Sequence, residues 1–256
     1  GVPSGRRPPA LVYGRNPVRE ALRAGGEVKR LVVLPRAASE PRLKELLELA
    51  EARNIPVEEA ERRRLDDIAH SEEHQGVVAY LGRRHYWELG DLLDAAAAEA
   101  APALLVLDEV QDPQNVGSVL RSAEAAGVLG VVISRNRAPE ITPAVAKASA
   151  GAVEHLRIAQ VGSIAQAVER IRDAGYWVVG LAGDGEVEYT RARYDGRLAL
   201  VVGSEGQGLH RLVRERCDQL VRLPMLGQVS SLNAAVAASI VMFEAQRQRA
   251  TDSKET

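Results

Sequence analysis

The stretch LALVVGSEGQGL, residues 198–209, decides the fold more than any other part of the chain. Its first five residues are an unbroken apolar run, which is typical of a strand that is covered on both faces, as in a parallel sheet. The residues from Gly203 to Gly208 include three glycines in six positions, which permit tight turns and leave backbone N–H groups bare for a ligand. The stretch therefore predicts an α/β domain with a ligand site after this strand. An ordinary glycine-rich turn is the alternative.

The alternation of strands and helices continues through the C-terminal part and predicts a mostly parallel sheet. Apolar runs indicate further strands, with helices between them, at residues 104–107, 130–134, 177–181 and 220–223. The N-terminal part alternates at shorter spacing, which favours a smaller α/β domain. There, Asn16 with Pro17 is expected to cap and begin the first helix.

Domain borders are expected where the apolar periodicity lapses. It weakens after residue 83 into a polar turn and an alanine-rich run, and it resumes beyond residue 102. The division that follows is a flexible N-terminus at 1–9, a first domain at 10–83, a linker at 84–102, a second domain at 103–249 and a flexible tail at 250–256.

The charge balance excludes a wholesale polybasic nucleic-acid binder. The chain has 33 Lys and Arg against 35 Asp and Glu, a net charge of −2. Residues 1–84 hold 16 basic and 13 acidic residues, whereas the remainder holds 17 and 22. The net +3 of the N-terminal part is the balance that a modest RNA-binding module shows, and a solvated mixed surface gives the same count.

The chain has a single cysteine, Cys217, which excludes an intramolecular disulfide framework and a multi-cysteine zinc site. A reducing compartment is therefore expected, with the cytoplasm as the default. No stretch approaches the roughly 20 consecutive apolar residues of a membrane-spanning helix. Residues 1–9 also lack the apolar core of a signal peptide.

A second informative segment is DPQNVGSVLR, residues 112–121. After the turn at its start, Asn115 is expected to cap a helix. On that helix Arg121 falls one turn after Gly117, so a phosphate or ribose has room at the backbone while the guanidinium holds it. The alternative is an exposed Arg121 that pairs with Glu124.

The third segment is LPMLGQVSSLN, residues 223–233, which leads into the last helix. Ser231 is expected to cap that helix. Asn233, placed inside the first turn, has no comparable structural role and is a candidate site residue. The helix carries apolar residues nearly all round, and such a helix is buried or lies in a subunit interface.

Two other patterns are weaker candidates. His70 and His74 have the spacing of helical metal ligands, but no third ligand is evident, so no metal site is expected. The run at residues 62–64, three arginines, is more typical of a solvated face than of an RNA contact.

Taken together, the three segments resemble the motifs of the SpoU (TrmH-like) class of SPOUT RNA ribose 2'-O-methyltransferases. The matching patterns, in the same order, are N-x-G-x-x-x-R from Asn115, G-S-E-G-x-G-L from Gly203 and L-P-M-x-G-x-x-S-S-L-N from Leu223. VYGRNPV at residues 12–18 and HQGV at residues 74–77 are similar to the N-terminal substrate-binding domain of the members that act on ribosomal RNA. The resemblance covers almost the whole chain.

This resemblance implies a fold, a cofactor and partners. The C-terminal domain would be a SPOUT-type parallel-sheet domain with a deep trefoil knot, and the smaller N-terminal α/β domain would resemble ribosomal protein L30e and bind RNA. S-adenosylmethionine would be the cofactor, and the protein would form a homodimer through its catalytic domain. The residues carried over as cofactor contacts are Gly203, Glu205, Gly206, Leu223, Met225, Leu226, Ser231 and Leu232.

The resemblance also implies the reaction, in which a ribose 2'-hydroxyl attacks the methyl group of a sulfonium. Because an ordinary arginine stays protonated, we expect Arg121 to orient the target phosphate and hydroxyl rather than act as the base, a role often given to it in this family. After Asn233 the chain departs from the usual Val-Ser and has Ala234-Ala235. The residues carried over are, as catalytic, Asn115, Arg121, Glu205, Ser231 and Asn233, and, as RNA-binding, Arg15, Asn16 and Arg121.

The leading interpretation is an enzyme that methylates a guanosine 2'-hydroxyl of 23S rRNA, either free or in an assembling large subunit. The alternatives are a tRNA 2'-O-methyltransferase and a catalytically silent RNA-binding or ribosome-assembly protein. A nicotinamide oxidoreductase is disfavoured because no G-x-G-x-x-G follows the first strand of either domain.

Overall fold

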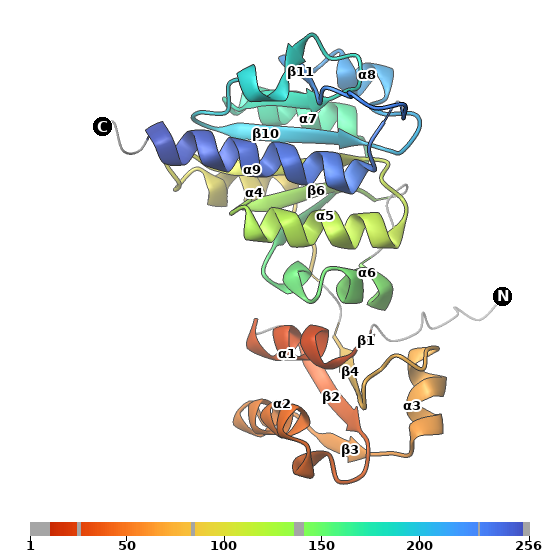
Figure 1. The fold of residues 1–256 in the computed structure, drawn as a ribbon. Coiled ribbons are helices and arrows are strands. Elements are labelled where there is room, and N and C mark those ends of the chain that lie inside the picture. Colours follow the sequence, from red (N-terminus) through yellow and green to blue (C-terminus); the bar gives the residue numbers. More distant parts are fainter. Residues whose placement is uncertain (1–10, 25–26, 83–84, 136–140, 230, 253–256) are drawn as a thin grey trace, which may run out of the picture. The chain divides into compact units, whose positions relative to one another are not determined.

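The computed structural model describes residues 11–24, 27–82, 85–135, 141–229 and 231–252. The chain divides into two compact units (Figure 1). Unit 1 comprises Gly1–His85 and Ile141–His155, and unit 2 comprises Tyr86–Glu140 and Leu156–Thr256. Of the ends expected to be flexible, residues 1–9 and 253–256 lie outside the described residues.

Unit 1 contains a four-stranded sheet in the order β1-β4-β2-β3. Strand β4 runs antiparallel to both β1 and β2, whereas β3 is parallel to β2. Val32, Leu65 and Val78 are completely buried in a small core between the sheet and a helix. The elements are β1 (Leu11–Tyr13), α1 (Arg15–Arg23), β2 (Val28–Val33), η1 (Ala37–Ser39), α2 (Pro41–Ala52), β3 (Val57–Glu59), α3 (Arg62–Ala69) and β4 (Val77–Leu81).

Helix α1 begins before the cap that the sequence predicts. Gly14 alone connects β1 to α1, and its φ of 90° is a conformation that favours glycine. Asn16 lies inside the first turn, where its side chain accepts a hydrogen bond of 3.2 Å from Arg19. The expected cap at Asn16 is therefore wrong, because the one-residue connection starts the helix at Arg15.

Residues 141–155 pack with unit 1, although the sequence analysis assigns them to the second domain. Lys147 pairs with Glu73, 74 positions away, and His155 Nε2 lies 2.9 Å from Glu20 Oε2, 135 positions away. Periodicity along the chain cannot reveal such distant partners. The segment contains α6 (Pro143–Ala148) and the short 3-10 helix η2 (Ala152–Glu154).

Unit 2 is built on a seven-stranded sheet in which all neighbouring strands run parallel, as the sequence predicts for its larger part. The order is β7-β6-β5-β10-β8-β11-β9. The sequence does not predict the two edge strands, since Arg157 and Gln160 interrupt the apolar run of β7 and β9 has only two residues. The strands are β5 (Ala103–Asp108), β6 (Gly130–Ser134), β7 (Arg157–Val161), β8 (Trp177–Leu181), β9 (Val187–Glu188), β10 (Leu198–Gly203) and β11 (Gln219–Arg222).

Helices cover both faces of this sheet. Alternate strand residues, such as Leu104, Val106 and Val201, share one core with α4, α7 and α8. On the other face α5 and α9 pack side by side, with α9 in front of β10 in Figure 1. Helix α4 lies within the segment that the sequence assigns to a linker. The helices are α4 (Leu89–Ala96), α5 (Pro113–Ala125), α7 (Ile164–Asp173), α8 (Arg211–Arg214) and α9 (Ala234–Asp252), with the 3-10 turn η3 (Tyr189–Arg191).

The strand order places several loops at one edge of the sheet. Strand β10 lies between β5 and β8, and β11 is the next neighbour of β8. Because all four strands are parallel, the loops that follow them emerge at the same edge, where α/β folds bind ligands. No helix among the described residues is long and apolar enough to cross a membrane.

The packing around Gly180 in β8 leads to a first prediction. A Cβ atom there would lie 2.7 Å from Leu209 Cδ1, 2.8 Å from Cys217 Sγ and 2.9 Å from Leu220 Cδ2. We expect Gly180→Ala to lower the free energy of unfolding of unit 2 by about 1–3 kcal/mol, the usual effect of overpacking. Denaturant unfolding followed by tryptophan fluorescence measures this loss, since both tryptophans of the chain lie in unit 2.

Gly162→Ala is the control, because a Cβ atom at Gly162 would meet no atom within 4 Å. An unfolding midpoint for Gly180→Ala equal to that of the control would contradict the prediction.

Candidate functional site

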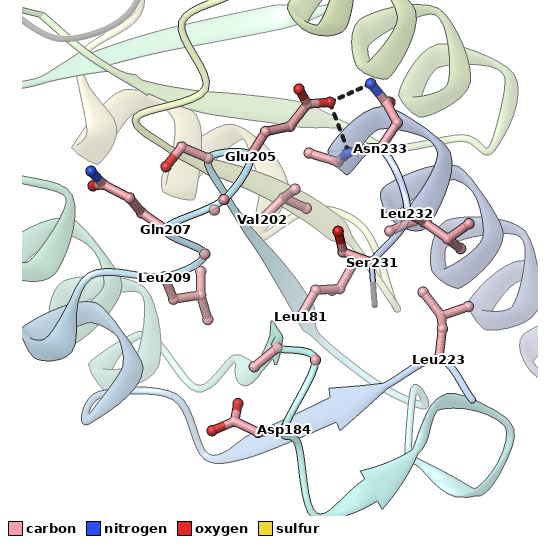
Figure 2. Close-up of a pocket in the computed structure, with 18 of the residues that line it drawn as sticks. Leu181, Asp184, Val202, Glu205, Gln207, Leu209, Leu223, Ser231, Leu232 and Asn233 are labelled. Atoms are coloured by element: carbon pink, nitrogen blue, oxygen red, sulfur yellow. Dashed lines mark hydrogen bonds between the residues drawn. The ribbon is translucent and has the colours of Figure 1, made fainter. Parts of the chain in front are cut away.

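A cavity of about 880 Å³ opens beside the loops that follow β8, β10 and β11 (Figure 2). Its volume is within the range of roughly 300–1,000 Å³ that is typical of small-molecule sites. Leucine side chains form an apolar part, and carboxylate, amide and hydroxyl groups form a polar part. The lining residues labelled in Figure 2 are Leu181, Asp184, Val202, Glu205, Gln207, Leu209, Leu223, Ser231, Leu232 and Asn233.

The glycine loop, residues 203–209, forms one wall of the cavity. Gly208 N donates a hydrogen bond of 2.9 Å to Ser204 O, which draws the two ends of the loop together. A Cβ atom on Gly203 would lie 2.2 Å from the carbonyl group of Gly208, so the closed loop has no room for a larger residue there. The predicted glycines thus build a tight loop directly after the buried strand.

Three polar side chains from distant parts of the chain are bonded to one another, and two of them, Glu205 and Asn233, line the cavity. Asn233 Nδ2 donates to Glu205 Oε1 and, over 2.9 Å, to Asn115 Oδ1. The same Glu205 oxygen accepts a hydrogen bond of 3.4 Å from Ala234 N, and Figure 2 shows both contacts of the carboxylate. The structure therefore brings together Asn115, Glu205 and Asn233 from the residues that the resemblance implies to be catalytic.

The helix caps beside this network differ from those expected. Asn233 Oδ1 accepts hydrogen bonds of 2.9 and 3.2 Å from the backbone N–H groups two and three positions ahead, so Asn233 caps α9 and the expected cap at Ser231 is wrong. Asp112 caps α5 by accepting a hydrogen bond of 2.8 Å from Asn115 N, so the expected cap at Asn115 is wrong as well. Asn233 thus has a structural role as the cap of α9, in contrast to the expectation from its sequence position.

Arg121 lies on the exposed face of α5, as predicted, whereas Gly117, which was expected on the same face with room for a ligand, is buried. Val116 and Leu120 are buried on the opposite side of the helix. No hydrogen bond or ion pair joins Arg121 to another residue that the structure describes, and the expected alternative pairing with Glu124 is not formed. Arg121 is also outside the lining of the cavity.

Most of the residues expected to contact a cofactor line the cavity, and the structure adds a charged pair. Leu226 is the exception, since it is 98% exposed and does not line the cavity. Arg214 donates hydrogen bonds of 2.7 and 2.9 Å to the two oxygens of Asp184, and both residues line the cavity. These bonds lower the pKa of the Asp184 carboxyl. The expected contacts that do line it are Gly203, Glu205, Gly206, Leu223, Met225, Ser231 and Leu232.

The sequence analysis does not single out Asp184. A signal was present, because Asp184 is a polar residue that follows the predicted strand at 177–181, as the other site residues follow their strands. The sequence offers no reason to single out Arg214. The pairing of these two residues spans 30 positions and follows no helical period.

A second cavity, of about 360 Å³, adjoins the first. Ser204, Glu205 and Gln207 line both cavities, so the glycine loop stands between them. The remaining lining of the smaller cavity is mostly polar and comes from the loop after β5 and the start of α5: Glu109, Val110, Gln111, Asp112 and Asn115.

Arg15 and Asn16 lie in unit 1, where contacts within that unit hold Arg15 in place. Arg15 N donates 2.9 Å to Gln75 Oε1, Arg15 Nε donates 3.3 Å to Gln75 O, and the guanidinium pairs with Glu40. The two segments of unit 1 that carry the resemblance, residues 12–18 and 74–77, are therefore bonded to each other.

His74 is completely buried beneath this turn. Its Nε2 lies 2.9 Å from Asp66 Oδ1, and its Nδ1 accepts a hydrogen bond of 3.0 Å from Gly76 N. Both ring nitrogens are thus engaged in holding the turn, as in the neutral tautomer with a proton on Nε2. Across the described residues, no three or more His, Cys, Asp or Glu residues are grouped so that they could hold a metal ion.

The only cysteine of the chain, Cys217, is not suited to act as a nucleophile. Burial raises the pKa of the Cys217 thiol to about 12, so the thiolate that a nucleophile requires does not form at neutral pH. The cavity instead offers fixed hydrogen-bonding groups and an apolar surface, which suit the orientation of bound molecules.

Two family profiles match this chain. The SpoU rRNA methylase family matches residues 102–243, and the substrate-binding domain of RNA 2'-O ribose methyltransferases matches residues 11–87. The first match alone covers more than half of the chain.

Curated relatives are similar over nearly the whole chain. The 23S rRNA (guanosine-2'-O-)-methyltransferase RlmB of Pseudomonas syringae pv. tomato is 41% identical, over 95% of this chain and 97% of that protein. The TrmH family tRNA/rRNA methyltransferase YacO of Bacillus subtilis is 41% identical, over 93% and 95%. The tRNA/rRNA methyltransferase slr0955 of Synechocystis is 37% identical over 94% of this chain, which spans only 63% of that longer protein.

Solved structures share the fold. The AdoMet-bound rRNA methyltransferase from Sinorhizobium meliloti is 28% identical with a TM-score of 0.79, over 94% of this chain and 88% of that one. The SpoU methyltransferase AviRb from Streptomyces viridochromogenes, in complex with the cofactor AdoMet, is 28% identical with a TM-score of 0.78, over 94% and 90%. The family match over more than half of the chain and the relatives at 41% identity over nearly all of it show that this chain belongs to the SpoU family of RNA methyltransferases.

Proposed function

We propose that the protein transfers a methyl group from S-adenosylmethionine (AdoMet) to a ribose 2'-hydroxyl, that of a guanosine in 23S rRNA. The observation that carries the proposal is the hydrogen-bonded group of Asn115, Glu205 and Asn233 at the boundary of two adjoining cavities. A transfer between two molecules requires two sites that meet at the reacting atoms, and this arrangement supplies them. The larger cavity takes the cofactor and the smaller one takes the acceptor nucleotide.

The larger cavity fits AdoMet by the chemistry of its lining. Leu181, Leu223 and Leu232 offer the apolar surface that an adenine ring needs, and the Asp184 carboxylate can accept hydrogen bonds from hydroxyl or ammonium groups. Backbone groups of the glycine loop complete the polar part. Bound there, AdoMet supplies an electrophilic methyl group on a sulfonium.

The residues of the chain hold the acceptor in line with that methyl group. Glu205 lines both cavities and presents a carboxylate that can accept the hydrogen bond of the 2'-hydroxyl as its proton leaves. Asn115 and Asn233 fix the carboxylate and the nucleotide, and Arg121 orients the target phosphate through its charge. Ser231, whose hydroxyl lies at the cavity wall, contacts the cofactor.

The N-terminal unit supports ribosomal RNA as the substrate. Its match to the RNA 2'-O ribose methyltransferase substrate-binding domain favours an RNA substrate, and the similarity to an RlmB enzyme favours 23S rRNA. In this proposal residues 10–83 bind RNA with the help of Arg15 and Asn16, and residues 103–249 catalyse the transfer. A tRNA substrate is the second candidate, since the name of the Bacillus subtilis relative includes tRNA.

We also propose a homodimer through α9. Val236 and Phe243 on this helix are 48% and 45% exposed in the single chain, and Leu232 just before it is 39% exposed. Together they form an apolar stripe of the kind that marks an interaction surface. The deep trefoil knot and the cytoplasmic location belong to the same proposal. The knot rests on the family resemblance, and the free thiol of Cys217 supports a reducing compartment.

The reaction is tested with methyl-labelled AdoMet and total rRNA or tRNA from a cell that lacks the protein. We expect label in large-subunit rRNA and one 2'-O-methyl stop in primer extension sensitive to ribose methylation. Label confined to tRNA would move the substrate to the second candidate.

Arg121→Ala serves as the control in this experiment. It is expected to bind AdoMet normally and to lose methylation by on the order of 100-fold, because it removes a group that positions the acceptor. Bound RNA without label in the unaltered protein would support a silent RNA-binding protein instead.

The double role of Asn233 allows its functions to be separated. Asn233→Asp retains an oxygen that caps α9, so we expect the melting temperature to stay nearly unchanged. The substitution removes the N–H donors and places a second carboxylate beside Glu205. We therefore expect activity to fall on the order of 100-fold or more. Asn233→Ala should lose the activity and also about 1 kcal/mol of stability with the cap. Methylation rates and thermal melts of the two variants measure this difference, and an active Asn233→Asp would exclude Asn233 from the site.

The dimer is tested by placing charge on the stripe. Phe243→Glu should convert a dimer into a monomer in light scattering, because an unpaired charge would be buried in the interface. Leu212→Glu is the matched control, since Leu212 is similarly exposed, at 49%, but lies on α8. A monomeric unaltered protein, or a dimer that survives Phe243→Glu, would contradict the proposed interface.

A further inference from the structure

His210 directly follows the glycine loop and contacts two consecutive carboxylates at the end of β5. Its backbone N–H donates a hydrogen bond of 2.7 Å to Asp108 Oδ2, and its Nδ1 lies 3.1 Å from the same oxygen. Its Nε2 lies 3.2 Å from Glu109 Oε2. Both nitrogens of the imidazole therefore face carboxylates, and the ring joins the two side chains.

These contacts attach both ends of the glycine loop to Asp108. At the start of the loop, Gly203 is paired with Asp108 in the register of β10 and β5. At its end, His210 returns to the Asp108 side chain through its backbone and its ring. Glu205 and Gln207, which line both cavities, lie on the chain between these two attachments.

The burial of Asp108 and the backbone conformation of Glu109 indicate that His210 does more than fill space. Asp108 is only 2% exposed, and a buried carboxylate is costly unless donors surround it. The backbone N–H of His210 supplies one such donor to Asp108, and the two ring nitrogens face Asp108 and Glu109. Glu109 has a φ of 57°, a conformation that is uncommon for residues other than glycine and persists where the surroundings hold it.

We propose that His210 is a positioning residue for the transfer reaction. By joining Asp108 to Glu109, it holds the glycine loop in the shape that presents Glu205 and Gln207 between the two cavities. It acts through the loop and through Glu109, which lines the smaller cavity. The identity of the molecules that the two cavities bind rests on the proposed function. The ordering of the glycine loop by His210 does not depend on that function.

Three substitutions separate the two contacts of the ring. His210→Asn keeps an N–H group near the position of Nδ1 and can still bond Asp108. His210→Gln keeps one near the position of Nε2 and can still bond Glu109. His210→Ala keeps neither. The control is Glu215→Gln at the other end of α8, where the Glu215 carboxylate forms an exposed pair with Arg211.

The first measurement is hydrogen exchange at the amides of residues 203–209 without any ligand. We expect His210→Ala to speed exchange about tenfold or more, as the loss of a hydrogen bond to a charged group implies. His210→Asn should restore most of the protection, because the bond to Asp108 closes the loop, and the control should match the unaltered protein.

The second measurement is calorimetric binding of AdoMet together with steady-state methylation. His210→Ala should weaken AdoMet binding about tenfold and lower kcat as well. His210→Gln, which keeps the contact with Glu109, should show a smaller loss of kcat than His210→Ala.

Unchanged loop exchange in His210→Ala would overturn the proposal. Equal losses in all three variants would overturn it too, because the ring would then contribute bulk rather than two specific contacts. Failure of the unaltered protein to bind AdoMet would refute the proposed cofactor, and the exchange rates would still decide whether His210 orders the loop.

Discussion

The hydrogen bonds on the two sides of the Asn233 amide are the interaction on which the site depends. Its oxygen accepts from the first N–H groups of α9 and fixes where that helix begins. Its nitrogen donates to Glu205 on the glycine loop and to Asn115 on α5. A serine or aspartate could cap the helix equally well, but neither carries the N–H donors that the other two residues require. One side chain thus joins the start of a helix to the chemistry of the cavity.

The parts of the fold that sequence predicts best are those in which a local pattern decides the structure. The apolar run before Gly203 becomes a buried central strand, and the glycines after it form the loop that their lack of a side chain permits. The caps were predicted wrongly because neighbouring residues compete for the same role. Asp112 and Asn115 can both accept from a helix N-terminus, and Pro113, which begins the helix, leaves the cap position to Asp112.

Contacts between distant residues account for most of what the sequence did not predict. Asp184 meets Arg214, and His210 meets Asp108 102 positions earlier. Each of these residues alone reads as an ordinary surface charge, and only the sheet order, which places β10 beside β5 and β8, brings the pairs together. The position of Asn233 in the first turn indicates a candidate site residue, the family resemblance adds Glu205, and the geometry shows that they are bonded to each other.

Unit 1 is formed by two separate parts of the chain. Its second part, residues 141–155, lies in the sequence between β6 and β7, which belong to unit 2. The polypeptide therefore passes between the two units three times. A truncation that removes residues 11–85 would therefore leave fifteen residues of unit 1 behind. Lys147 and His155 would lose Glu73 and Glu20, so a fragment built around unit 2 has to replace the contacts of this segment.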